Sequence, residues 1–164
     1  MVYPSFRTML VAVALIATGA SARAATTGTL VLSGTIGQVC SIAVAPQGIA
    51  SALDLNIAQT ALVVASITET SNDNAGYKVN LNTANGTSTG IFKGTAGNTD
   101  TLAYTVLYNG VTETFVGGNV QVTNVTTRTP TGGVVKPVAL TYGAGAGLNS
   151  DTYTDTLTVT LTAN

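Results

Sequence analysis

The chain ends on a stretch that alternates between two kinds of side chain, Tyr153-Thr154-Asp155-Thr156-Leu157-Thr158-Val159-Thr160-Leu161-Thr162. Successive side chains of a β-strand point to opposite faces, so this spacing predicts a strand with one mainly apolar face and one threonine face. Such a strand buries its apolar face against a second layer. The stretch therefore predicts an all-β fold, a sandwich or a barrel.

The same alternation recurs in two earlier segments. Residues 28–36 have one face made of Gly28, Leu30, Leu32, Gly34 and Ile36. Residues 77–82 place Tyr77, Val79 and Leu81 opposite three polar side chains, and a turn follows at Asn85-Gly86. Both segments are predicted to be strands.

A hairpin is predicted around Asn109-Gly110, which separates residues 102–108 from residues 111–116. A type I′ turn needs positive φ at both central positions, and Asn-Gly adopts it readily. Residues 119–127 and 134–142 are further strand candidates. Residues 50–65 fit neither the strand nor the helix period, so a partly helical segment stays open there.

The composition excludes several functions. The 164 residues include no histidine, one cysteine and 13 charged side chains. A Ser-His-Asp triad, a histidine-bearing zinc site and a Cys-His nucleophile pair are therefore excluded. Six basic side chains are too few to suggest a nucleic-acid partner.

Residues 1–24 are predicted to be a cleaved signal peptide. Arg7 precedes the apolar residues 9–17, and Ala22-Arg23-Ala24 supplies the small-x-small cleavage pattern. An uncleaved anchor is the alternative, but the apolar run is shorter than the about 20 residues of a membrane span. Cleavage would leave one domain over residues 25–164, exported and not inserted in the membrane, with four basic and seven acidic side chains.

No cofactor, metal or catalytic residue is predicted. The seven carboxylates are Asp54, Glu69, Asp73, Asp100, Glu113, Asp151 and Asp155. Their spacing singles out no catalytic pair, and most belong in or beside turns. The runs at residues 72–74 and 149–151 offer clustered oxygens, but neither matches a calcium loop. Residues 143–147 are glycine-rich but lack the Gly-Lys-Ser/Thr of a phosphate loop, so a flexible loop is expected.

Cys40 is the only cysteine. An exported domain needs two cysteines for an internal disulfide, so Cys40 is either a buried thiol or part of an intermolecular bridge. The neighbouring Val39 and Ile42 favour the buried thiol.

Four segments together resemble pilus subunits of the chaperone-usher type, especially the spore coat U-like and archaic branch. They are residues 27–36, Val39-Cys40-Ser41-Ile42, residues 76–81 and residues 153–161. Members of that family usually pair the first cysteine with a second one near the end of the central strand. This chain has Asn82-Thr83-Ala84 there instead and departs from the pattern.

The resemblance implies an immunoglobulin-like sandwich that lacks its final strand. A periplasmic chaperone, and then the N-terminal extension of the next subunit, would fill the resulting groove. The donor strand would span about residues 25–38 and insert Gly28, Leu30, Leu32, Gly34 and Ile36. The same resemblance assigns contacts with chaperone and groove to Tyr153, Leu157, Val159 and Leu161. The alternative is that residues 28–36 form the first strand of a complete sandwich.

The expected function is therefore that of a structural subunit of a surface fimbria, with a role in attachment or biofilm formation. Its expected partners are copies of itself, a periplasmic chaperone and an outer-membrane usher. The alternative is a secreted β-sandwich adhesin or carbohydrate-binding module that does not polymerise. That alternative needs an exposed aromatic platform.

Overall fold

The computed structural model describes residues 27–95 and 97–164. They divide into a short N-terminal unit that ends at Thr35 and a β-sandwich that begins at Ile36. The predicted signal peptide, residues 1–24, lies outside the described residues. Within the described part of the chain, no helix has the length and apolarity to cross a bilayer.

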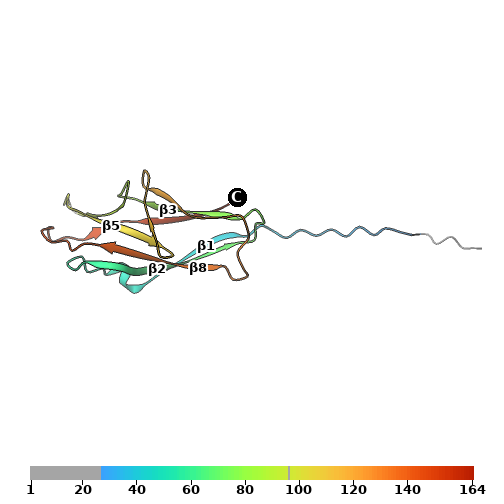
Figure 1. Ribbon diagram of the computed structural model, residues 1–164, viewed down its shortest axis with the longest axis horizontal. Helices are drawn as coiled ribbons and strands as arrows, with labels where there is room; N and C mark the ends of the chain where they lie inside the picture. Colours follow the sequence, from blue (N-terminus) through green and yellow to red (C-terminus); the bar gives the residue numbers. More distant parts are fainter. Residues whose placement is uncertain (1–26, 96) are drawn as a thin grey trace, which may run out of the picture. The chain divides into compact units, whose positions relative to one another are not determined.

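The sandwich consists of two antiparallel sheets, which confirms the predicted fold class (Figure 1). The larger sheet runs in the order β1 (Cys40–Pro46), β2 (Gln59–Ser71), β8 (Val134–Tyr142), β5 (Thr101–Tyr108), β4 (Gly90–Gly94) and β9 (Tyr153–Thr154). The short strand β6 (Val111–Glu113) pairs with β5. The smaller sheet runs in the order β10 (Leu157–Ala163), β3 (Tyr77–Thr83) and β7 (Asn119–Val125).

The central strand β3 has the predicted alternation. Tyr77, Val79 and Leu81 are buried between the sheets, whereas the polar residues between them are half-buried. The facing core comes mainly from β2, β5 and β8 and includes Ile67, Val106 and Leu140. The inward faces of both sheets are therefore joined in one hydrophobic core.

The predicted hairpin is confirmed between β5 and β6. Asn109 and Gly110 have φ values of 52° and 81°, as the two central positions of a type I′ turn require. The sequence favoured neither helix nor strand around residues 50–65. The structure has one short 3₁₀ helix there, η1 (Gly48–Ser51), and β2 begins at Gln59.

The terminal stretch forms two strands where the sequence predicts one. β9 pairs with β4 in the larger sheet, whereas β10 pairs with β3 in the smaller sheet. The chain changes sheets at Asp155, whose carboxylate accepts hydrogen bonds from the hydroxyls of Thr83 and Tyr104 at 2.6 and 2.7 Å. A strand that served both sheets could not stay straight at this corner.

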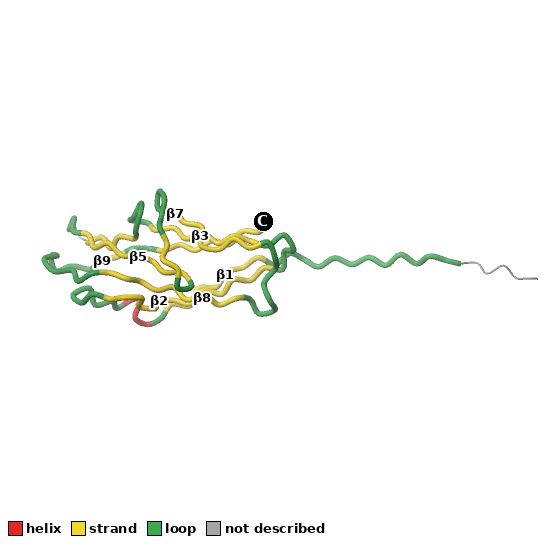
Figure 2. Tube along the Cα trace, viewed as in Figure 1, coloured by secondary structure: helices red, strands yellow, loops and turns green. Residues whose placement is uncertain are grey.

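Residues 27–35 are extended and join no strand ladder (Figure 2). The first strand of the sandwich is β1. The sequence predicts a strand over residues 28–36, and the structure assigns none there. Their alternation is that of a strand without a partner among the described residues.

Candidate functional site

Two neighbouring strands of the sandwich each have one open edge. β1 pairs only with β2, and β10 pairs only with β3, among the strands of the described chain. The two strands belong to opposite sheets and lie close to each other. Their free N–H and C=O groups can receive another strand.

An apolar cavity of about 190 Å³ lies between the sheets beside these edges. β10 contributes Leu157 and Val159, and β1 contributes Pro46. The floor is made of core side chains, namely Val64, Ile67, Leu81, Phe92, Tyr104, Val138 and Leu140. An apolar cavity of about 150 Å³ can hold a benzene ring, so this one has room for a large aliphatic side chain. We call the space between β1 and β10, including this cavity, the groove.

The alternation of β10 sets the character of the groove. Leu157, Val159 and Leu161 are half-buried, whereas the threonines between them are exposed. Val44 in β1 is 51% exposed although its strand belongs to the sandwich. Apolar side chains on both edges are thus left without full cover.

Tyr153 does not join the other predicted terminal-strand residues. It lies in β9 opposite Gly94. Its hydroxyl donates a hydrogen bond to the carbonyl of Asn149 at 2.8 Å and accepts one from the amide of Asn98 at 3.0 Å. The change of sheet at Asp155 separates Tyr153 from the three β10 residues.

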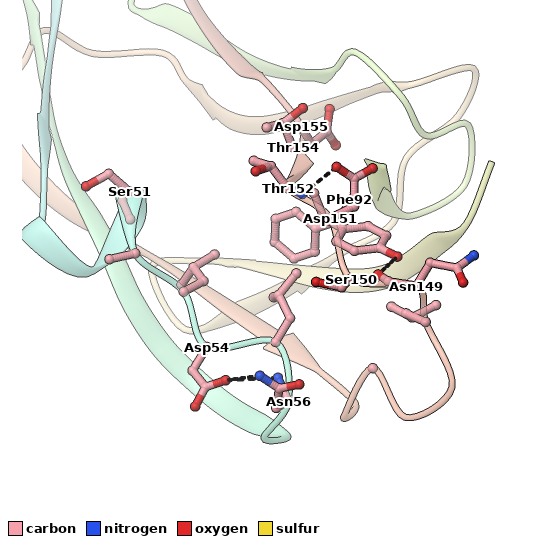
Figure 3. Close-up of a pocket in the computed structure, with 17 residues that line it drawn as sticks. Ser51, Asp54, Asn56, Phe92, Asn149, Ser150, Asp151, Thr152, Thr154 and Asp155 are labelled. Atoms are coloured by element: carbon pink, nitrogen blue, oxygen red, sulfur yellow. Dashed lines mark hydrogen bonds between the residues drawn. The ribbon is translucent and has the colours of Figure 1, made fainter. Parts of the chain in front are cut away.

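A second, polar cavity of about 580 Å³ continues from one end of the groove (Figure 3). The two cavities share Ala50, Leu53, Phe92 and Asp155 as lining residues. The second is bounded by the segment after η1, with Asp54 and Asn56, and by the loop before β9, with Asn149 and Asp151. We call this end of the sandwich, residues 48–56, 93–95, 97–100 and 143–155, the mouth end.

Asp151 is an anchor of the mouth end. A hydrogen bond from the Thr95 hydroxyl, at 2.8 Å, is the main reason that the pKa of the Asp151 carboxyl lies below its ordinary value. Its Oδ2 atom is shielded from solvent and has no hydrogen-bond partner in the described ranges. Asp151 is thus an anion with one unused acceptor.

The opposite end of the sandwich carries the link to the extension. The N–H of Val39 donates to Oδ1 of Asn72 at 2.7 Å, and the Asn72 amide donates to the carbonyl of Gly37 at 2.9 Å. The Gln38 amide also donates to Asp73. We call this end, residues 37–40, 72–78 and 126–133, the neck end.

The predicted donor residues are exposed and form no ladder. Leu30, Leu32 and Ile36 are 82%, 84% and 90% exposed. Gly28 and Gly34 are surrounded by open space, since a β-carbon added to either would have no atom within 4 Å. The extension thus carries a row of apolar side chains that the described chain does not cover.

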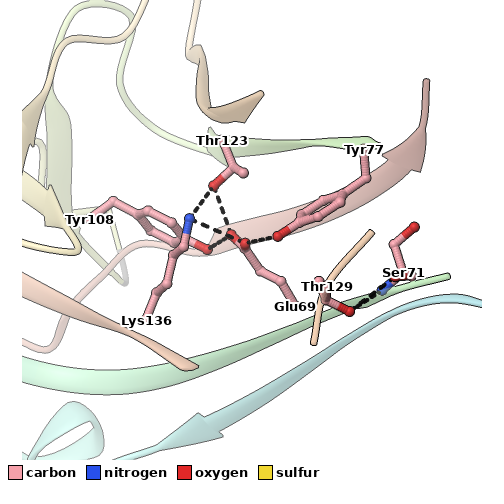
Figure 4. A network of polar contacts seen from close by, with 7 residues as sticks. All are labelled: Glu69, Ser71, Tyr77, Tyr108, Thr123, Thr129 and Lys136. Carbon is pink, nitrogen blue, oxygen red and sulfur yellow. Dashed lines mark hydrogen bonds and ion pairs between the residues drawn. The ribbon is translucent and has the colours of Figure 1, made fainter. Parts of the chain in front are cut away.

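A buried polar network connects the two sheets, and sequence analysis missed it (Figure 4). Glu69 in β2 is fully buried. It accepts hydrogen bonds from the hydroxyls of Tyr77, Tyr108 and Thr123 at 2.8, 2.6 and 2.8 Å, and Lys136 Nζ lies 3.2 Å from it. Burial alone would raise the pKa of Glu69, but these hydrogen bonds and the lysine charge lower it below 4.5. One sign of this network was available in the sequence. Glu69 lies between Thr68 and Thr70 in a strand-like stretch, whereas most acidic residues were expected in turns.

The structure contradicts the prediction that the Cys40 thiol is buried. The thiol expected to be buried is exposed, because Cys40 begins β1 at the edge of the larger sheet. It is the free cysteine of the chain. Of the two apolar neighbours that favoured burial, Val39 is 47% exposed and Ile42 is only partly buried against the core.

The oxygen-rich turn at residues 72–74 is hydrogen-bonded within the chain. At residues 72–74, Asp73 accepts from the N–H of Ala75 at 2.7 Å, in addition to its contact with Gln38. Over residues 27–95 and 97–164, no group of three or more His, Cys, Asp or Glu side chains is arranged to hold a metal ion. In the glycine-rich loop, Gly145 N–H donates to the carbonyl of Leu55, and β9 follows rather than a helix.

Comparison with protein-family models and with curated proteins found no match.

Proposed function

We propose that this chain is a structural subunit of a surface fimbria and polymerises by donor-strand exchange. The observation that carries the proposal is the open apolar groove between β1 and β10, in a chain whose own extension has alternate apolar residues left uncovered. A strand placed in the groove would bury Leu30, Leu32 and Ile36 and pair with a free sheet edge.

The lengths of donor and acceptor agree. β10 spans seven residues, from Leu157 to Ala163. Residues 30–36 are also seven, so a donated strand could pair along the whole edge. Gly34 has no side chain, which suits the close backbone approach of a narrow slot.

The donor strand is proposed to run antiparallel to β10. β10 begins at the mouth end and finishes at the neck end, where Ala163 pairs with Tyr77. An antiparallel donor therefore leaves the groove at the mouth end, so the neck of the donating subunit faces the mouth of the accepting one. A parallel donor would place the neck end of the donating subunit against the neck end of the accepting subunit. The accepting subunit's own extension leaves from that same end. Only the antiparallel direction leaves every subunit a free accepting end.

The remaining parts of the proposal come from the resemblance to chaperone-usher pilus subunits. An apolar groove on an exported subunit needs temporary cover, which a periplasmic chaperone would supply before an outer-membrane usher passes the subunit to the cell surface. Attachment or biofilm formation is the role proposed for the filament. No catalytic step and no cofactor belong to this proposal.

The carbohydrate-binding alternative has no observation in its favour. It needs an exposed aromatic platform. Six of the seven aromatic side chains of the described residues are buried, namely Tyr77, Phe92, Tyr104, Tyr108, Phe115 and Tyr142. The seventh, Tyr153, is half-buried and uses its hydroxyl within the loop before β9.

The test is to append a second copy of residues 25–38 after Asn164. β10 ends at the neck end, so a short turn would lead the copy into the groove antiparallel to β10. We expect the melting temperature to rise by at least about 10 °C, since a few kcal/mol shifts the melting temperature of a domain of this size by that much. The unmodified chain should aggregate or polymerise.

Two substitutions within the appended copy provide the matched comparison. Leu32→Asp puts a charge on the face that enters the groove and should abolish the gain in melting temperature. Val31→Asp puts the same charge on the opposite face and should keep most of the gain. If the appended copy leaves the melting temperature unchanged, or if the unmodified chain is a stable two-state monomer, the proposal is wrong.

A further inference from the structure

We propose that the neck end of each subunit docks on the mouth end of its neighbour through opposite charges, and this inference rests on the proposed strand exchange. The occupant of the polar cavity is thus the neck of a second copy of this chain. The contact would add to donor-strand insertion and would set how fast subunits join.

The tether between donor and sandwich is too short to keep the two ends apart. Only Gly37, Gln38 and Val39 separate Ile36 from Cys40, the first residue of β1. The four residue steps from Ile36 to Cys40 span at most about 14 Å. Once Ile36 of the donor is in a neighbour's groove, the donor's own sandwich must lie against the neighbour's mouth end.

The polarity of the donor changes where the polarity of the groove changes. The apolar cavity gives way to the polar cavity around Asp155, just before Leu157. An antiparallel donor would bring Ile36 to this place and lead Gly37-Gln38 into the polar cavity. Asp151 is among the residues that line this cavity.

The two ends carry opposite charge. The mouth end contains one basic residue, Lys93, and four acidic residues, namely Asp54, Asp100, Asp151 and Asp155. The neck end contains two basic residues, Lys78 and Arg128, and one acidic residue, Asp73. Glu69 and Lys136 neutralise each other inside the sandwich.

Arg128 is the cation best placed to reach a neighbour. It is exposed, and its loop is fixed at the neck end because the N–H of Thr129 donates to the carbonyl of Ser71 at 2.9 Å. Within the described ranges the ion pair is between Lys136 and Glu69, so Arg128 has no acidic partner there. Complementary charges of this kind steer association and fix orientation.

The experiment measures how fast the purified chain of residues 25–164 assembles after dilution from denaturant, by light scattering with electron microscopy of the product. We expect the rate to fall about ten-fold between about 20 mM and about 500 mM NaCl, because salt screens attraction between exposed charges. Arg128→Glu should slow assembly about three-fold or more at low salt and have little effect at high salt. Adding Asp54→Lys to Arg128→Glu should restore part of the rate.

Gln121→Glu is the control for an added negative charge away from the two ends. Gln121 is exposed in the middle of β7, opposite Asn80 and away from both ends, so the added charge should leave the rate unchanged. In the form with the appended donor, Arg128→Glu should melt at the wild-type temperature, which shows that the variant folds.

The outcomes separate the two proposals. Filaments that form at a rate independent of salt, or equal rates for Arg128→Glu and Gln121→Glu, would overturn the charged contact and leave strand exchange standing. Absence of assembly at every salt concentration, together with no stabilisation by the appended donor, would overturn both.

Discussion

Lys136 Nζ lies 3.2 Å from Oε2 of Glu69, whose side chain is fully buried between the two sheets. Lys136 also donates a hydrogen bond to Thr123 Oγ1 at 2.9 Å, and Thr123 in turn donates to Glu69. Glu69 and Lys136 belong to the larger sheet and Thr123 to the smaller one. The network therefore joins the sheets by polar contacts in a chain that has no internal disulfide.

Glu69→Gln should destabilise the sandwich by about 3 kcal/mol, because breaking a buried ion pair leaves an uncompensated charge. The amide also cannot accept all the hydrogen bonds that the carboxylate now receives. The measurement is urea unfolding of the chain with the appended donor strand.

The control for this substitution is Glu113→Gln. Glu113 is a half-buried acid in β6, and burial raises the pKa of its carboxyl. Removing this charge should leave the free energy of unfolding unchanged or raise it slightly. Equal losses of stability in the two variants would contradict the importance of the Glu69 network.

Stability should fall on acidification. The pKa of Glu69 is below 4.5 in the folded chain, so its contribution is present above the unfolded pKa and is lost as the pH falls through the folded value. Unfolding followed from pH 7 to about pH 3 should show this loss begin near the ordinary glutamate pKa of about 4.3. Glu69→Gln should flatten the curve in this range. The pKa of Glu113 is raised instead, so protonation of Glu113 favours the folded chain as the pH falls. Glu113→Gln removes this gain and should make the loss of stability in acid slightly steeper.

Asp155 should stabilise the corner where the chain passes from the larger sheet to the smaller one. Asp155→Ala should cost at least about 2 kcal/mol, because it leaves the buried Tyr104 hydroxyl without its acceptor. Tyr104→Phe removes the same hydrogen bond and should cost about 1 kcal/mol. In urea unfolding, the double variant should lose less than the sum of the single losses. Additive losses would mean that the two groups are not coupled.

The strands and their faces could be predicted from sequence because period-two alternation and turn chemistry are local. β3, β8 and the hairpin at Asn109-Gly110 are cases in point. The half-buried row of Leu157, Val159 and Leu161 was also predictable, because it depends only on alternation.

The remaining features depend on contacts between residues far apart in the chain. The break at Asp155 follows from acceptance of hydrogen bonds from Thr83 and Tyr104, which alternation does not reveal. Glu69 is buried because its partners come from four other strands. Cys40 is exposed because β1 is an edge strand, and sequence neighbours do not show which strand ends a sheet.

Cys40 should react with a maleimide as fast in the folded chain with the appended donor as in denaturant, within about three-fold, because an exposed thiol needs no unfolding. Cys40→Ser should change stability by less than about 0.5 kcal/mol, as expected for an exposed site. Mass spectrometry of the labelling reaction measures the rate. A labelling rate a hundred-fold or more slower in the folded chain than in denaturant would show that the Cys40 thiol is buried.

Gly90 should tolerate no side chain, because a β-carbon there would lie 2.1 Å from the Tyr104 ring. The ring cannot turn aside, since it stacks on Phe92 with centroids 4.4 Å apart and its hydroxyl is held by Asp155. Gly90→Ala should therefore cost about 2 kcal/mol or more. Gly143→Ala is the matched control, since no atom lies within 4 Å of its β-carbon position, and it should change stability by less than about 0.5 kcal/mol. Urea unfolding of both variants, with the donor strand appended, measures the difference, and equal effects would show that Tyr104 can move away from Gly90.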